Sequence, residues 1–103
     1  MNYSVIISEK AKMDIRDIYE YIAFSLYAPK AAANITGKIE KAILSLDLNP
    51  ERYRLYDKEP WKTRGLRLLP VENYIIFYIP DENAGTVTIT RVMYGGRDID
   101  NSL

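Results

Sequence analysis

The sequence predicts an α+β domain with the element order β-αα-βββ, in which an N-terminal helical hairpin packs on one face of a mostly antiparallel four-stranded sheet. Three observations support this prediction. A short β-rich segment opens the chain, apolar residues then recur at helical spacing, and three β-rich runs fill the last third. Because 103 residues suffice for one core, we expect a single domain over residues 1–103.

The first part of the chain should hold one strand and one helix. Residues 2–7 are rich in β-forming residues, and Ser8 is a good N-cap for a following helix. An apolar stripe predicts that helix over residues 9–27, and it consists of Ile15, Ile18, Tyr19, Ile22 and Leu26. Two charge pairs with a spacing of four are expected on its exposed face, Lys10 with Asp14 and Arg16 with Glu20.

A second helix should follow and form an antiparallel hairpin with the first, since the turn between them is short. Pro29 suits the first turn of this helix, and Asn49 with Pro50 ends it. Its apolar stripe consists of Ile35, Ile39, Ala42, Ile43 and Leu46. Residues 51–63 are polar and aromatic, so we expect a loop there.

Three strands are expected near residues 64–70, 73–79 and 86–94, separated by turns at 71–73 and 81–85. Side chains alternate along a strand, so parity assigns each residue to a face. The residues expected to face the helices are Leu66, Leu68, Ile75, Phe77, Ile79, Val87 and Ile89.

The opposite, uncovered face should then carry polar and aromatic residues around one cation, namely Arg67, Tyr74, Tyr78, Thr88, Thr90 and Tyr94. Such a surface suits a peptide, a phosphate or stacked bases. An ordinary amphipathic sheet would carry the same residue types, since Tyr and Thr are common in strands. On this assignment, Arg67→Ala should leave the fold intact.

Two further arginines lie at the end of the chain. Strict alternation would bury Arg91 with the core residues of its strand, so we expect a bulge or an edge position and a structural ion pair. The glycines at 95 and 96 free the backbone. Arg97 could therefore turn toward the uncovered face or pair locally with Asp98.

The composition excludes several kinds of site. The chain has no cysteine and no histidine, so we expect no disulfide, no metal site and no cofactor, and any catalysis must use Arg, Lys, Tyr, Asp or Glu. Net charge is zero, from 14 basic and 14 acidic residues, which argues against broad nucleic-acid binding. Residues 52–67 nevertheless hold six basic and two acidic groups, either as a binding patch or as a solvated loop.

The termini and hydropathy bear on localisation. The N-terminal segment lacks the features of a signal peptide. No apolar run approaches the roughly 18 residues of a membrane span. We therefore expect a soluble cytoplasmic protein that does not contact membranes.

Several segments in order resemble the RelE/ParE superfamily, the toxins of bacterial type II toxin–antitoxin modules. They are Tyr3–Ser8, Ile18–Ile22, Leu66–Leu68, Tyr74–Tyr78 and Ile89–Asp98. The resemblance spans nearly the whole chain and rests on order and spacing. It implies the β-αα-βββ fold, and a cognate antitoxin whose C-terminal segment wraps the toxin in a hetero-oligomer.

The resemblance implies one of two mechanisms. RelE-like members cut mRNA in the ribosomal A site by assisting attack of the ribose 2′-hydroxyl, whereas ParE-like members poison DNA gyrase and need no nuclease centre. The candidate catalytic residues of a ribonuclease here are Arg67, Tyr94 and Arg97. The candidates for binding a target or a phosphate are Arg67, Tyr74, Tyr78, Arg64 and Lys62.

Three features favour the ParE-like mechanism. The helical hairpin is long, Ile75 stands where the nucleases typically carry an arginine, and zero net charge suits a ribosome-binding nuclease poorly. We therefore expect a growth-inhibiting toxin of gyrase, neutralised by an antitoxin. The alternatives are an mRNA endoribonuclease and a degenerate toxin that only binds antitoxin.

Overall fold

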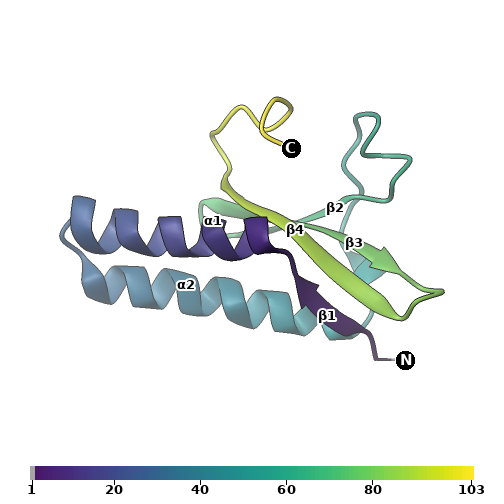
Figure 1. Cartoon of the computed structure of the whole chain (residues 1–103), viewed down its shortest axis with the longest axis horizontal. Coiled ribbons are helices and arrows are strands. Elements are labelled where there is room, and N and C mark those ends of the chain that lie inside the picture. The colour runs from purple at the N-terminus through teal and green to yellow at the C-terminus, as the bar shows by residue number, and fades with distance from the viewer. Residues whose placement is uncertain (1) are drawn as a thin grey trace.

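The computed structural model describes residues 2–103, and its elements follow the predicted β-αα-βββ order (Figure 1). The first half contains β1 (Ser4–Ile7), α1 (Glu9–Glu20), the π-helix η1 (Tyr21–Ser25) and α2 (Pro29–Leu44). Two short 3-10 helices follow, η2 (Ser45–Asp47) and η3 (Pro50–Arg52). After a loop come β2 (Arg67–Val71), β3 (Tyr74–Asp81) and β4 (Thr86–Tyr94).

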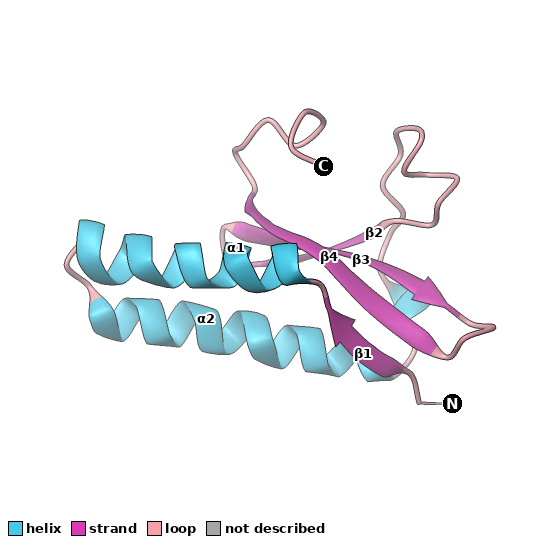
Figure 2. Ribbon diagram, in the orientation of Figure 1, coloured by secondary structure: helices cyan, strands magenta, loops and turns pink. Residues whose placement is uncertain are grey.

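The four strands form one mixed sheet in the order β1-β4-β3-β2, with β1 parallel to β4 and the other neighbours antiparallel. The register between β3 and β4 shifts after Phe77, which leaves Thr90 as an extra residue in β4. Helices α1 and α2 pack against each other on one side of the sheet and extend beyond its end (Figure 2).

Local sequence signals account for the start of each helix. The Ser8 side chain accepts a hydrogen bond from the Ala11 amide at 3.1 Å, and Pro29 occupies the first turn of α2.

The predicted pair of Arg16 and Glu20 is present at 3.5 Å. The first helix ends differently from the prediction, because its last turn is the π-helix η1. That turn shifts the side-chain register, so Leu26 leaves the apolar stripe and is 54% exposed.

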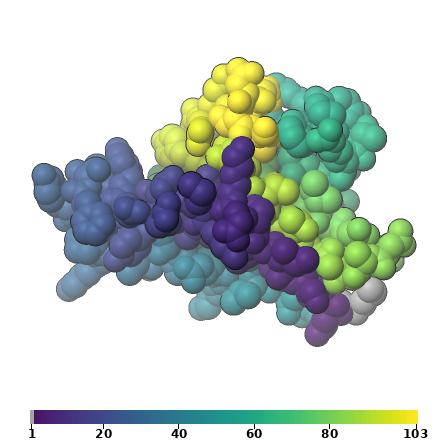
Figure 3. Space-filling view, in the orientation of Figure 1, coloured from purple at the N-terminus to yellow at the C-terminus, as the bar shows by residue number. Residues whose placement is uncertain are grey.

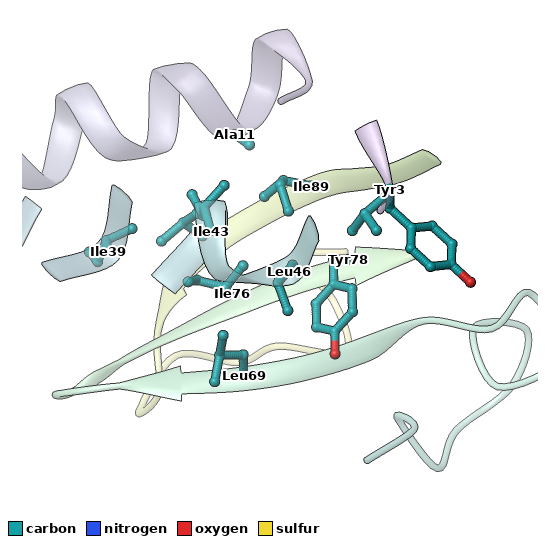
Figure 4. Close-up of a cluster of buried hydrophobic side chains, with 11 residues drawn as sticks. Tyr3, Ala11, Ile39, Ile43, Leu46, Leu69, Ile76, Tyr78 and Ile89 are labelled. Atoms are coloured by element: carbon teal, nitrogen blue, oxygen red, sulfur yellow. The ribbon is translucent and has the colours of Figure 1, made fainter. Parts of the chain in front are cut away.

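The main core lies between the helices and the sheet (Figure 4). Buried residues of both helices pack there against residues of three strands, and those drawn and labelled in Figure 4 are Tyr3, Ala11, Ile39, Ile43, Leu46, Leu69, Ile76, Tyr78 and Ile89. Val87 and Ile89 face the helices as predicted. Residues 76 and 78 also face the helices, so the predicted faces of β3 are reversed.

The face of the sheet away from the helices is also covered, which contradicts the prediction of an open face. Its buried residues are Tyr56, Leu66, Leu68, Phe77 and Met93, with Trp61, Ile75, Ile79, Ile99 and Leu103 packed around them. The cover comes from the loop before β2 and from the C-terminal segment. In Figure 3 these two segments lie side by side, in teal and yellow.

The reversal has a physical reason. When both faces of a strand are buried, apolar residues occupy both parities and alternation no longer identifies the helix side. The position of Tyr78 was therefore mispredicted, because a tyrosine with its polar hydroxyl is expected at the surface. In the structure it is fully buried, and its hydroxyl donates a 2.6 Å hydrogen bond to the Pro50 carbonyl. The predictions that Leu66 and Leu68 face the helices and that Tyr78 is open are therefore wrong.

Candidate functional site

A groove of about 740 Å³ opens between the projecting half of the helical hairpin and the end of the sheet where β3 begins and β4 ends. Its lining is mostly apolar and aromatic and comes from both layers: Ile18, Tyr21, Ile22, Leu26, Ala28, Ala31 and Ile35 from the helical side, and Tyr74, Val92, Met93 and Tyr94 from the sheet. The polar lining residues are Asp14, Asp17, Asn73 and Arg97. The groove therefore offers an apolar floor with a few charges at its rim.

Two tyrosines form the sheet side of this groove. Tyr74 and Tyr94 are directly opposite each other in the register, and their rings meet edge to face with centroids 5.9 Å apart. Burial raises the pKa of the Tyr74 hydroxyl, so Tyr74 is a neutral hydrogen-bonding group at ordinary pH. Tyr94 is 54% exposed, and its ring lies so close to Gly96 that a Cβ there would come within 2.6 Å of it. The glycine therefore permits this position of the ring.

Asp14, one of the residues that line the groove, belongs to a nearly buried ion pair. Asp14 accepts hydrogen bonds from Arg91 Nε at 2.7 Å and Nη2 at 3.0 Å, and from the Val92 amide at 3.0 Å. Because β1 ends at Ile7, this carboxylate takes the place of a neighbouring strand at Val92. The hydrogen bond to Asp14 also raises the pKa of Arg91.

The prediction that Arg91 forms a structural ion pair is confirmed, and its strand carries the expected bulge. The prediction that Lys10 pairs with Asp14 is wrong, because Asp14 is turned toward the sheet and bound to Arg91. Arg91 also donates to the Ser102 carbonyl at 2.5 Å, which ties the C-terminal segment to the same pair.

Arg67 lies at the other end of the sheet from this groove. It is opposite Tyr78, whereas Tyr74 and Tyr94 align with Val71, four residues further along β2. That separation is about 13 Å along the strand. Arg67 Nη1 donates to the carbonyls of Glu51 at 3.0 Å and Tyr53 at 2.6 Å. The predicted open position of Arg67 is thus wrong.

The other sequence-predicted residues lie in three places. Tyr74, Tyr94 and Arg97 share the groove. Lys62 and Arg64 lie on the exposed loop before β2, where the Arg64 guanidinium sits 5.1 Å from the Trp61 ring centroid. Tyr78 is buried, so it is unavailable to a partner, and burial strongly raises its pKa. The residues proposed for a ribonuclease are therefore not gathered in one site.

Sequence reasoning missed the helical side of the groove. The signal was present, because residues 21–29 carry no charge and hold four large residues that are more than half exposed: Tyr21, Phe24, Leu26 and Tyr27. A continuous uncharged stretch at a helix–helix turn is unusual for a solvated surface. Within residues 2–103, no group of three or more His, Cys, Asp or Glu side chains could hold a metal ion. None of the helices described is both long and apolar enough to span a bilayer.

Comparison with known proteins supports a common family. A family model described as the ParE toxin of type II toxin–antitoxin systems, parDE, matches residues 5–99. No curated protein sequence matches the chain. The fold resembles that of a chain in the chromosomal ParDE toxin–antitoxin system of P. aeruginosa, with a TM-score of 0.72, 20% identity, and coverage of 89% of this chain and 95% of that one.

Two RelE-type structures are also similar in fold. A chain of the RelBE2 toxin–antitoxin complex from Mycobacterium tuberculosis has a TM-score of 0.64 and 22% identity, over 91% of this chain and 99% of that one. A mutant of the E. coli toxin RelE in the free state has a TM-score of 0.68 and 13% identity, over 99% of this chain and 93% of that one. Because the family model covers nearly the whole sequence, the chain belongs to the ParE toxin family of type II toxin–antitoxin systems.

Proposed function

We propose that this toxin inhibits DNA gyrase, and that an antitoxin neutralises it by filling the groove between the helical hairpin and the sheet. The observation that carries the first part is the separation of Arg67 from Tyr94 by about 13 Å along the strands, while Arg97 lies with Tyr94 in the groove lining and Arg67 does not. The ParE family match favours the same target.

Ribonucleolytic catalysis needs groups that converge on one phosphate. Arg67 is engaged by two backbone carbonyls, and its charge is directed away from the groove. Among residues 2–103, no side-chain hydrogen bond engages the Tyr94 hydroxyl, so no general base is already hydrogen-bonded to it in the free chain. Inhibition by binding requires no such convergence.

The groove suits an antitoxin segment for chemical reasons. Its apolar floor would bury one face of an amphipathic segment, and its rim offers one exposed charge of each sign, Asp17 and Arg97. Two of the similar structures are described as toxin–antitoxin systems or complexes. An antitoxin that covers the groove would also cover Tyr94 and Arg97, whichever target the free toxin has.

The mRNA endoribonuclease stays as a second candidate, because Tyr94 and Arg97 do share the groove and could bind a phosphate together. In that case Arg67 would not be one of its catalytic residues. A toxin that only binds its antitoxin is the third candidate.

Expression of the chain in bacteria, with and without its antitoxin, separates these candidates. We expect growth arrest with loss of plasmid supercoiling and intact mRNA, reversed by the antitoxin. Cleavage of mRNA at defined codon positions before any change in supercoiling would overturn the gyrase proposal in favour of the ribonuclease. Unimpaired growth would leave only the antitoxin-binding module.

A further inference from the structure

A basic projection lies outside the groove, and the function proposed above assigns it no role. It comprises residues 52–67, which hold six basic and two acidic residues, whereas the rest of the chain holds eight basic and twelve acidic ones. Its two arms pair through hydrogen bonds from the Tyr56 amide to the Leu66 carbonyl at 2.8 Å and from the Leu68 amide to the Arg54 carbonyl at 3.2 Å. The neutral total therefore conceals a separation of charge between this loop and the rest of the molecule.

Half of these cations are used within the fold. Arg52 donates to the carbonyls of Leu48 and Asn49, and Arg67 donates to two others, as described above. Lys58 pairs with Asp100 in the C-terminal segment. The other three are Arg54, Lys62 and Arg64, which are exposed, and within residues 2–103 no side-chain hydrogen bond or ion pair engages them.

The turn that presents two of these cations is held in place. The Glu59 carboxylate accepts from the Thr63 amide at 2.9 Å and from the Thr63 hydroxyl at 2.7 Å, and these hydrogen bonds lower the pKa of Glu59. The Lys62 amide donates to the Lys58 carbonyl at 3.0 Å. A partner would thus meet a backbone that is already ordered, and binding would cost little conformational entropy there.

The surface chemistry indicates which kind of anion fits. A protein interface usually has an apolar core, but within residues 52–67 Leu55, at 38%, is the one exposed large hydrophobic residue. Single-stranded nucleic acid needs open aromatic faces for stacking. Trp61 does not provide one, because it packs into the outer core cluster and Arg64 lies over its ring. What remains exposed are charges suited to a phosphate backbone.

We propose that Arg54, Lys62 and Arg64 contact the phosphate backbone of double-stranded DNA without reading its sequence. The duplex form follows from the surface chemistry of the loop. The choice of DNA over RNA rests on the proposed function, since a gyrase inhibitor acts where duplex DNA is bound.

Binding of a short fluorescent DNA duplex to the purified full chain, measured by anisotropy across a range of salt, tests this inference. Three phosphate contacts predict that affinity falls about 40-fold between about 50 and 200 mM monovalent salt. The triple variant Arg54→Gln, Lys62→Gln, Arg64→Gln should lower the magnitude of the log–log salt slope by about 2.7, which is about 0.9 for each lost phosphate contact. A matched variant with Lys10→Gln, Lys30→Gln and Lys41→Gln removes the same charge from the helices and should keep the slope.

Equal slopes for the loop variant and the wild type would overturn the inference, as would equal losses in both triple variants. Binding of poly-glutamate as tight as that of DNA would assign the loop to acidic proteins, and binding of an RNA duplex alone would assign it to RNA. Gyrase inhibition is measured separately with the same samples. If the chain inhibits gyrase but does not bind DNA, this inference fails and the proposed function stands. If the chain binds DNA through the loop but does not inhibit gyrase, this inference stands and the proposed function fails.

Discussion

At the scale of single residues, Asp14 links three parts of the structure, although strand parity gave no indication of this role. Its carboxylate joins α1 to the Arg91 guanidinium and to the backbone of β4, and Arg91 in turn holds the carbonyl of Ser102. The side chains of the pair are only 12% and 11% exposed. Removal of one partner would therefore leave a nearly buried charge without compensation.

We predict that Asp14→Asn lowers the free energy of unfolding by about 3 kcal/mol, in the range for a broken buried ion pair. Urea unfolding of the purified variant measures this. Glu20→Gln breaks the exposed pair with Arg16 and serves as the control, with an expected cost of at most about 0.5 kcal/mol. Equal effects of the two substitutions would contradict the role given to Asp14.

Arg67 provides a second prediction at this scale, and here the structure reverses the expectation from sequence. Because its guanidinium donates to two loop carbonyls, Arg67→Ala should cost about 1.5–3 kcal/mol of stability. Arg64→Ala, on the exposed turn, should cost much less. Thermal unfolding of both variants measures this difference. An unchanged melting temperature for Arg67→Ala would contradict the structural role of Arg67 and support its predicted position on an open face of the sheet.

Tyr78 predicts a dependence of stability on pH. Burial raises the pKa of Tyr78 in the folded protein, whereas in the unfolded chain it titrates near pH 10. Above about pH 10 the unfolded state thus loses the proton first, so stability is full below that pH and falls as pH rises further. Denaturant unfolding between neutral pH and pH 11 should show this loss. Tyr78→Phe should lessen it, and an identical alkaline loss in that variant would contradict the account.

At the scale of elements, sequence patterns predicted which elements form and which side of β4 faces the helices, but they assigned the wrong sides to β2 and β3. The Ser8 cap, Pro29 and the apolar stripes act locally, so they can be read from neighbouring residues. The face of β3 depends on segments distant in sequence. Phe77 is buried by the loop before β2 and by the chain end, and Tyr78 finds its hydrogen bond in η3. Neither partner could be placed from periodicity alone.

In the candidate site too, some residues could be predicted from local sequence, whereas the groove depends on how distant elements are arranged. Tyr94 was identified from its strand and Arg97 from its position after the glycines at 95 and 96, and both line the groove. The groove itself forms because the helical hairpin extends beyond the sheet, and Tyr21 and Leu26, at the two ends of the π-helix η1, both line it. A one-residue shift in a helix changes which side chains share a face, and an ordinary helical stripe cannot anticipate it.

This element leads to a prediction about the antitoxin. Leu26→Asp places a charge at the groove rim, at a position already 54% exposed, so the fold should persist while antitoxin affinity falls at least about 10-fold. Met13→Asp is the matched control, since Met13 is 52% exposed on α1 and lies outside the groove lining. Isothermal titration with the antitoxin measures both. Equal affinities for the two variants would place the antitoxin elsewhere.

At the scale of the whole molecule, the chain presents two separate surfaces. Its extents are 43 × 29 × 21 Å, and the helical hairpin occupies one end of the long axis (Figure 1). The groove lies between that hairpin and the sheet. The basic projection lies beyond the C-terminal segment as seen from the hairpin (Figure 3). This arrangement suits a protein that binds partners with distinct surfaces, and it does not gather the cationic residues that a phosphate-cleaving centre would need.

The central claim is that the toxin acts on gyrase by binding and not on mRNA by catalysis. The most direct measurement is ATP-dependent supercoiling of relaxed plasmid by purified gyrase, titrated with the purified chain, alongside ribosome-bound mRNA incubated with the same samples. We predict dose-dependent loss of supercoiling, reversal by the antitoxin, and uncut mRNA. Full supercoiling at all toxin concentrations together with cleavage of the ribosome-bound mRNA would contradict this account.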